Sequence, residues 1–252
     1  MANARIVIPC YNEEDRLDVA SFRQFKNLSH QITFLFVNDG STDGTRRFLE
    51  GLQTSEPTKF TILNLPQNQG KAEAVRQGLL AAIDSQPDYV GFWDADLATP
   101  LDAIPEFLDL AERRPDLEMI FGSRVKLLGR RIERRPTRHY IGRVFATVVS
   151  AILGVAVYDT QCGAKLFRVS SSIKALLQEP FQSRWIFDVE ILARLIQARR
   201  GTQLPQPEQV ISEFPLLEWK DVPGSKLGYS DFVRAAWELS RIYIYYFQNR
   251  KR

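Results

Sequence analysis

Apolar runs rich in β-branched and aromatic residues alternate with amphipathic stretches through the first half of the chain. The runs predict strands because they are short and bounded by turn residues, at 5–9, 32–38, 60–65, 89–93 and 118–122. The stretches predict helices because each opens on a polar residue or proline, at 13–26, 43–52, 71–85 and 100–113. This alternation predicts an α/β fold, a parallel sheet with helices on both faces. Such a sheet binds ligands beyond the carboxyl ends of its strands.

The regular alternation of predicted strands and helices ends at residue 124. The second half predicts a long apolar helix near 137–154, a short strand at 164–168 and helices near 187–200 and 229–248. Neither a repeat nor a low-complexity linker separates the two halves. Because 252 residues suit one large domain, we predict a single domain over residues 1–252 that is built from two half-sites.

The formal net charge of +3 conceals two halves of opposite sign. Residues 1–123 contain 11 Lys and Arg against 19 Asp and Glu, a net charge of −8. Residues 124–252 contain 22 Lys and Arg against 11 Asp and Glu, a net charge of +11. Such asymmetry indicates a division of function between the halves.

The N-terminal segment and the two cysteines favour a cytoplasmic protein. The first apolar stretch is too short for a signal peptide and lacks a small-residue cleavage site. The longest uncharged apolar run, 144–158, is shorter than the ~20 residues that span a bilayer as a helix. Cys10 and Cys162 lie far apart without zinc-ligand spacing, so we expect two reduced thiols.

Acidic residues follow three of the predicted strands. Glu13 follows the first strand, Asp39 the second, and the pair Asp94 and Asp96 the fourth. An acidic rim repels a nucleotide phosphate unless a divalent cation intervenes, and Mg²⁺ binds through one or two carboxylates together with substrate phosphates. The Asp-x-Asp pair therefore predicts a metal site, although a solvated turn has the same pattern.

Two further residues at this rim have a functional and a plain structural interpretation. The Asp39 carboxylate can accept the imide N–H of a uracil, whereas Asp-Gly and Ser-Thr-Asp sequences also occur in ordinary turns and helix caps. Lys71 opens a predicted helix after the turn at 68–70, where a diphosphate could lie. A lysine at a helix start is more often simply exposed.

Taken together, these segments resemble the inverting family 2 glycosyltransferases of the GT-A fold. The resemblance rests on VIPCYNEE (7–14), VNDGSTDGT (37–45), NQGK (68–71), DAD (94–96) and GSR (122–124). The second half is similar to the dolichyl-phosphate β-glucosyltransferase branch in DTQCGAKLF (159–167), RWIFDVE (184–190) and GSKL (224–227). The resemblance implies a Rossmann-like nucleotide-sugar-binding half, 1–123, and an acceptor-binding half, 124–252, with amphipathic helices.

For the donor, the resemblance implies roles that can be carried over residue by residue. It implies that uridine is held by Pro9, Tyr11, Glu13 and Asp39. It further implies that Asp96 is the main ligand of Mg²⁺ or Mn²⁺ and that Asp94 faces the ribose and the metal. Lys220 and Lys226 match the basic pair on a mobile loop that closes on the diphosphate. Mannose synthases have Gln two residues after the second Asp, and Ala98 stands there. Glucose is therefore favoured over mannose.

For the acceptor, the resemblance implies a polyprenyl phosphate of dolichyl or undecaprenyl type, whose phosphate Arg124 and Arg138 grip. The family has a serine four residues after the second arginine, where this chain has Gly142. A phosphate with a second pKa near ~6 is largely ionised at neutral pH and needs no protein base. We therefore expect in-line displacement of UDP from a UDP-sugar by the acceptor phosphate.

Three alternatives remain open. A family 2 enzyme with a hydroxyl acceptor, such as a polysaccharide, would use Asp188 as its base. A sugar-nucleotide-binding protein without activity would be expected to have lost the Asp-x-Asp pair, which is intact. A nucleic-acid-binding function is disfavoured because no known module is present and the acidic half repels the backbone.

The distribution of basic and apolar residues predicts peripheral association with the cytoplasmic face of a membrane. Between Arg124 and Arg143, eight Lys and Arg stand against one Glu, directly before the apolar run 144–158. A lipid phosphate requires cations for its head and an apolar surface for its chain. The C-terminal helix adds interfacial aromatic residues before a basic end, namely Phe232, Trp237, Tyr243, Tyr245, Tyr246 and Phe247. Residues 229–241 also fit a core helix.

Overall fold

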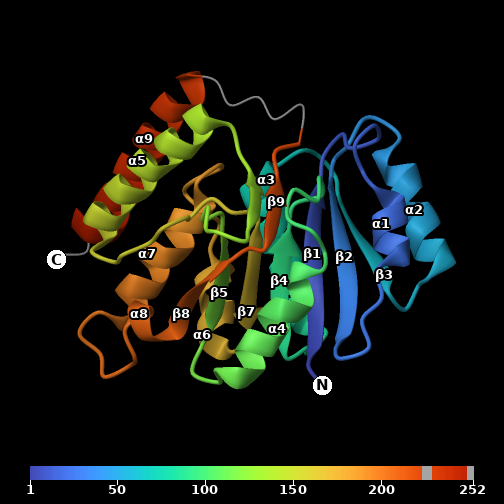
Figure 1. Cartoon of the computed structure of the whole chain (residues 1–252), viewed down its shortest axis with the longest axis horizontal. Coiled ribbons are helices and arrows are strands. Elements are labelled where there is room, and N and C mark those ends of the chain that lie inside the picture. Colours follow the sequence, from blue (N-terminus) through green and yellow to red (C-terminus); the bar gives the residue numbers. More distant parts are fainter. Residues whose placement is uncertain (223–228, 249–252) are drawn as a thin grey trace.

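A computed structural model describes residues 1–222 and 229–248 (Figure 1). At its centre is a seven-stranded sheet with the order β3-β2-β1-β4-β7-β5-β8. The strands are β1 (Asn3–Cys10), β2 (Gln31–Asp39), β3 (Phe60–Leu65), β4 (Tyr89–Trp93), β5 (Met119–Ser123), β7 (Ala164–Arg168) and β8 (Ile211–Pro215). All strands predicted for the first half are present, which confirms the α/β fold.

β7 departs from the parallel arrangement of the other strands. The pairs β1·β2, β1·β4 and β2·β3 are parallel, as the alternating pattern predicts. β5 also pairs in parallel with β8, a strand that the sequence pattern did not predict. β7 instead runs antiparallel between β4 and β5, with Ala164 opposite Trp93 and Lys165 opposite Phe121. An antiparallel strand begins where its neighbours end. The loop at 159–163 therefore lies at the carboxyl edge of β4, where the sheet binds ligands.

Helices cover both faces of the sheet, as predicted. α1 (Val19–Gln24), α2 (Thr45–Ser55) and α4 (Ala103–Arg113) pack on one face around buried side chains such as Phe22 and Phe107. α3 (Lys71–Asp84), α6 (Ser171–Gln178) and α7 (Phe187–Arg199) pack on the other face. α8 (Pro207–Val210) is a single short turn before β8.

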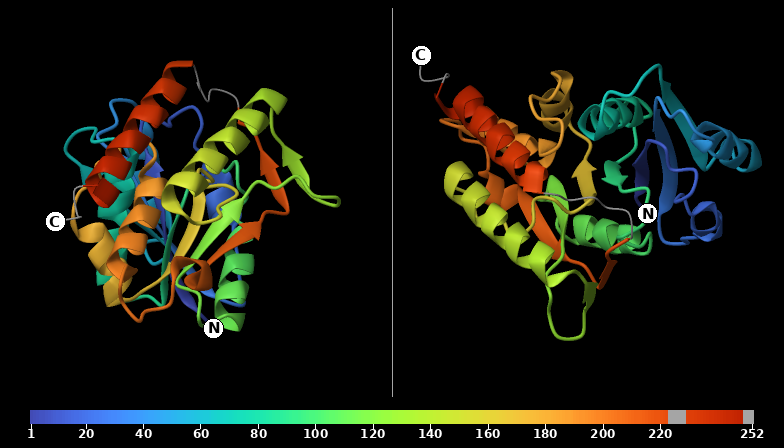
Figure 2. Two further views of the ribbon diagram at one scale, coloured as in Figure 1. Left: turned by 90° about the vertical axis from the view of Figure 1, so that its left-hand side faces the viewer. Right: turned by 90° about the horizontal axis from the view of Figure 1, so that it is seen from above.

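Two long helices lie at the end of the molecule opposite α1 and α2 (Figures 1 and 2). They are α5 (Pro136–Leu153) and α9 (Tyr229–Tyr243), and the π-helical segment η1 (Ile244–Gln248) extends α9. Both contribute buried residues to the core around α7, among them Val149 and Leu239. Within residues 1–222 and 229–248, no helix combines the length and the apolar character needed to cross a bilayer.

The first predicted helix, 13–26, is wrong over its first turns, because α1 begins only at Val19. The backbone N–H of Glu13 donates to Thr45 Oγ1 at 2.7 Å, and that of Glu14 donates to Asp43 Oδ2 at 3.1 Å. These bonds hold the segment against the loop after β2. Asp18 then caps α1 by accepting from the N–H of Ser21.

A small second sheet, which the sequence pattern did not predict, joins two segments of the second half. β6 (Arg131–Glu133) pairs in parallel with β9 (Glu218–Lys220). Beyond this pair, the N–H of Lys220 donates to the carbonyl of Ala98 at 3.1 Å. The basic segment after β5 is therefore fixed beside the loop that follows the Asp-x-Asp pair.

Candidate active site

A cavity of about 250 Å³ opens at the carboxyl edge of β4. Its polar wall combines residues from both halves of the chain, including Lys71, Asp94, Asp96, Arg124, Asp159 and Asp188. Its apolar wall includes Phe145 and Ala146 of α5, Ala235 of α9, and the side chains of Trp185 and Trp219. The acidic first half and the basic second half thus meet in one cavity.

Asp94 is held on three sides immediately after β4. Its N–H donates to the carbonyl of Gly163 at 2.9 Å, and its Oδ1 lies 2.5 Å from Lys71 Nζ. A Cβ atom at residue 163 would lie 2.0 Å from Asp94 Oδ2. Only glycine therefore fits at position 163 without displacing the carboxylate. Lys71 is paired with Asp94, and its contact with a diphosphate remains a prediction.

Asp96 lies in the same cavity as Asp94, and its Oδ1 accepts from the N–H of Ala98 at 3.1 Å. Burial, and after it the charge of Asp94, raises the pKa of Asp96. A carboxylate whose ionisation is disfavoured by a neighbouring carboxylate in a partly buried site is suited to a divalent cation. Ala98 adds no side-chain oxygen, so Asp94 and Asp96 are the protein ligands that this loop offers.

The residues predicted to hold uridine lie on the neighbouring strand ends. Glu13 is paired with Arg16 at 2.7 Å. Burial raises the pKa of Glu13, and the charges of Asp96 and Asp94 contribute in the same direction. Pro9 lies near the end of β1, and Tyr11 just beyond it is 44% exposed. Their contact with uridine remains a prediction.

Asp39 has the structural role that its turn pattern suggested. Its Oδ1 accepts from the N–H of Gln69 at 2.8 Å, and its Oδ2 accepts from the N–H of Gly70 at 2.9 Å and from Asn68 Nδ2 at 3.0 Å. Asp39 is 2% exposed. The carboxylate therefore fixes the turn that places Lys71 at the start of α3, and its contact with a uracil remains a prediction.

Arg124 is already engaged by a carboxylate. Its Nε lies 2.6 Å from Asp159 Oδ2 and its Nη2 lies 2.7 Å from Asp159 Oδ1. Burial would raise the pKa of Asp159, but the charge and hydrogen bonds of Arg124 outweigh it and lower that pKa to about 2. Sequence reasoning missed this pairing, although both residues lie in motifs that it singled out.

Asp188 lies in the first turn of α7, where Lys165 Nζ approaches its Oδ1 to 2.6 Å. Lys165 is fully buried and also donates to the carbonyls of Thr160 and Cys162, at 3.0 and 2.6 Å. Burial raises the pKa of Asp188, and Lys165 opposes that shift. Lys165, to which the sequence patterns assigned no role, therefore ties Asp188 to the loop before β7.

Lys226, Arg138 and Lys220 are the remaining basic residues that the sequence predicts for the site. Lys226 lies outside the described residues. Arg138 belongs to α5, but its side chain lies outside the described part of the structure. Lys220 ends β9 with its side chain exposed. Arg134, which sequence reasoning did not single out among the neighbouring cations, does line the cavity.

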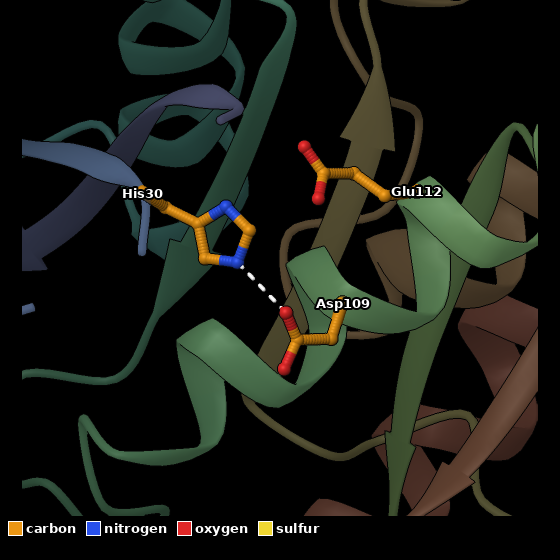
Figure 3. A group of neighbouring side chains, drawn as sticks. All are labelled: His30, Asp109 and Glu112. Atoms are coloured by element: carbon orange, nitrogen blue, oxygen red, sulfur yellow. Dashed lines mark hydrogen bonds and ion pairs between the residues drawn. The ribbon is translucent and has the colours of Figure 1, made fainter. Parts of the chain in front are cut away.

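A second group of potential metal ligands lies elsewhere. His30, Asp109 and Glu112 have ligand atoms within 4.8 Å of one another (Figure 3). His30 precedes β2, at the amino edge of the parallel strands and therefore away from Asp94 and Asp96. Its Nε2 lies 2.9 Å from Asp109 Oδ1, and its Nδ1 lies 3.4 Å from the N–H of Ala2. Both ring nitrogens are thus engaged in linking β1 and β2 to α4.

An Asp-x-Asp pair at the carboxyl edge of this sheet, in a cavity shared with basic residues of the second half, is the arrangement that the resemblance to glycosyltransferases of the GT-A fold predicts. The profile described as Glycosyl transferase family 2 matches residues 5–176. The chain belongs to glycosyl transferase family 2.

Named relatives lie within this family. A dolichyl-phosphate beta-glucosyltransferase of Trichomonas vaginalis is 32% identical over 254 residues, which cover 96% of this chain and 73% of the relative. That of Saccharomyces cerevisiae is 32% identical over 256 residues, which cover 93% of this chain and 72% of the relative. The resemblance to this branch is therefore confirmed.

The fold is also found among solved structures. Glucosyl-3-phosphoglycerate synthase from Mycobacterium tuberculosis, in complex with Mn²⁺, UDP and glucosyl-3-phosphoglycerate, superimposes with a TM-score of 0.65. The match covers 97% of this chain and 79% of that chain at 16% identity. Another structure of that enzyme contains Mn²⁺ and UDP-glucose, with the same TM-score of 0.65. At this identity the likeness establishes the fold alone.

Proposed function

We propose that this glycosyltransferase moves glucose from UDP-glucose to a polyprenyl phosphate, with inversion at the anomeric carbon and with Mg²⁺ or Mn²⁺ as cofactor. The observation that carries the proposal is the single cavity in which Asp94 and Asp96 share space with Arg124 and with an apolar wall from α5 and α9. The relatives named for dolichyl phosphate and glucose support this assignment.

Asp94 and Asp96 are the residues that would hold the cation, and Lys71 lies at the same place. A divalent cation there supplies the positive charge that stabilises a leaving diphosphate. Lys71 contributes a further positive charge at the start of α3. Glu13 follows β1, the strand that pairs with β4 in the sheet, and there we place the nucleoside.

The apolar wall of the cavity suits the first isoprene units of a lipid acceptor. Phe145 and Ala146 come from α5, and Ala235 comes from α9. A phosphate that enters between these helices arrives at Arg124 with its charge already developed, so the attacking oxygen needs no protein base. Asp188, ion-paired with Lys165, then positions groups in the cavity without removing a proton.

The same arrangement supports peripheral binding to a membrane, which we place at its cytoplasmic face. On α5, the exposed apolar side chains Tyr140, Val144 and Val148 lie on one helical face. On α9 and η1, Trp237 is 58% exposed and Ile244 is also exposed. Aromatic and aliphatic side chains at this end suit a bilayer interface, and basic residues add attraction to anionic lipids.

The test is a donor and acceptor screen with the purified protein in lipid vesicles. Radiolabelled UDP-glucose, UDP-galactose and GDP-mannose are each offered with dolichyl phosphate, undecaprenyl phosphate or soluble sugar acceptors, with Mg²⁺, Mn²⁺ or a chelator. We expect label in the lipid fraction from UDP-glucose with a polyprenyl phosphate, and none with the chelator. Transfer to soluble sugars without lipid product would contradict the proposal.

A further inference from the structure

A buried carboxylate of α9 lies against the segment that leads into α7. Glu238 is 5% exposed, and its Oε2 accepts from Ser183 Oγ at 2.5 Å. The same oxygen accepts from the backbone N–H groups of Trp185 and Ile186, both at 3.2 Å. Backbone N–H groups away from water need an acceptor, and Glu238 supplies it from a different helix.

Two further contacts hold the same segment. Ser183 Oγ donates to Glu238 and also accepts from the N–H of Ile186 at 2.8 Å, since a hydroxyl can do both. Glu190 of α7, which is fully buried, accepts from the N–H groups of Gln182 and Ser183 at 2.9 and 2.8 Å. The backbone of 182–186 is therefore held from two sides, by α7 and by α9.

This segment forms part of the cavity wall. Trp185 and Ile186 both line the cavity, as does Ala235 of α9. Ala235 and Glu238 lie on the same face of α9, because residues three apart are neighbours on a helix. The inner face of α9 thus closes the cavity with one residue and anchors the opposite part of the wall with another.

We propose that Glu238 is a positioning residue, which acts through Ser183 and the backbone of 185–186 to hold the Trp185 side chain in the cavity wall. Its effect on transfer rests on the proposed function, in which this apolar wall meets the lipid acceptor. Loss of the Glu238 carboxylate leaves three donors without their acceptor. Buried donors without an acceptor are costly to leave in place, so the segment rearranges and Trp185 moves with it.

The first test reads the position of Trp185 without the reaction. The chain has four tryptophans, so protein labelled with 5-fluorotryptophan gives four fluorine NMR signals, and single Trp→Phe variants assign them. We expect Glu238→Ala to shift or broaden the Trp185 signal and to leave that of Trp93, fully buried in β4, unchanged. Glu238→Gln should return the Trp185 signal to near its wild-type position, because its side-chain oxygen can still accept.

The second test measures kcat/KM for polyprenyl phosphate at saturating UDP-glucose, well below the unfolding temperature. We expect Glu238→Ala to lower it about 10- to 100-fold, the range for a misplaced group in a site, and Glu238→Gln to recover most of the loss. When Trp185 is already alanine, Glu238→Ala should cost less than about twofold, because the group that Glu238 positions is gone.

Glu118→Ala is the matched control for a loss of stability. Glu118 precedes β5 and anchors the other end of α7 through Arg199, whose Nη2 lies 2.6 Å from Glu118 Oε1. This variant should unfold at a lower temperature but keep its kcat/KM within about twofold of the wild type. If Glu238→Ala does not fold, Ser183→Ala takes its place. Its control is Ser240→Ala, since the Ser240 hydroxyl donates to a carbonyl within α9.

An unchanged Trp185 signal in Glu238→Ala, or in Ser183→Ala where that variant replaces it, overturns the inference. The inference also fails if Glu238→Ala transfers glucose as well as Glu118→Ala, or if it costs the same factor with and without the Trp185 side chain. A wild type that transfers nothing to any polyprenyl phosphate overturns the proposed function instead, and the fluorine signal still decides whether Glu238 positions Trp185.

Discussion

Replacing Lys165 with methionine tests whether one buried ammonium holds the rim of the cavity together. Its Nζ lies 2.6 Å from Asp188 Oδ1 and donates to the carbonyls of Thr160 and Cys162. Methionine fills similar space but leaves the Asp188 carboxylate buried without its cation. Removal of one partner from a buried pair costs about 3–5 kcal/mol, and we expect Lys165→Met to lower the free energy of unfolding by that amount.

The double variant Lys165→Met/Asp188→Asn isolates the cost of the unpaired charge. Because asparagine is neutral, the double variant should be more stable than Lys165→Met alone by at least about 1 kcal/mol, although both contacts of the pair are gone. Urea unfolding followed by tryptophan fluorescence gives all the free energies. The control is Lys174→Met, which breaks an exposed pair of 2.8 Å with Asp84 and should cost less than about 1 kcal/mol.

Two outcomes would refute this reasoning. Lys165→Met could match the surface control Lys174→Met, in which case the buried ammonium does not organise the rim. The double variant could instead be less stable than the single one, in which case the carboxylate of Asp188 is not the group that needs Lys165.

Four other predictions follow from the site. Gly163→Ala should lower turnover about 100-fold, since the new Cβ displaces the Asp94 carboxylate; turnover near that of the wild type at an unchanged unfolding temperature would contradict this. Asp188→Asn should lower turnover less than about tenfold with a polyprenyl phosphate, whereas loss of a general base costs 10²- to 10⁴-fold. Burial raises the pKa of Asp159, but Arg124 lowers it to about 2, so this carboxylate contributes stability that is complete above about pH 4 and lost as the pH falls toward 2. The destabilisation by Asp159→Asn, about 2 kcal/mol at pH 6, should therefore shrink as the pH falls below about 4 and be largely gone near pH 2 in urea unfolding, and a constant difference would count against the pairing. Trp237→Ala should weaken sedimentation with anionic lipid vesicles, because the indole is 58% exposed on α9. Binding equal to that of the wild type would show that Trp237 does not contact the membrane.

Local patterns in the sequence were sufficient for the first half of the fold. Strands β1 to β5 and helices α2 to α4 follow from hydrophobic runs and start signals, because each element buries a face of its own. The carboxyl ends of β1, β2 and β4 then share one rim, so the location of Glu13 and the Asp-x-Asp pair at the same edge of the sheet was predictable. The helix predicted at 13–26 was wrong at its start because Thr45 and Asp43 compete for its backbone N–H groups.

Contacts between distant segments could not be predicted in this way. The antiparallel direction of β7 and the pairing of β6 with β9 depend on where the chain returns to the sheet. The partners of Arg124 and Lys165 lie 35 and 23 residues away, and a spacing pattern does not say which carboxylate meets which cation. Arg134 was one of several cations in a basic segment, and its place in the wall of the cavity is known from the structure and not from the pattern.

The central claim is that the acceptor is a phosphate and that the enzyme therefore needs no base. The most direct measurement compares transfer from UDP-glucose to a polyprenyl phosphate with transfer to the polyprenol of the same chain length, in the same vesicles and with the same metal. The account predicts glucosylated lipid from the phosphate and none from the alcohol. Comparable transfer to the polyprenol would show that a hydroxyl group can be activated here, and would contradict the account.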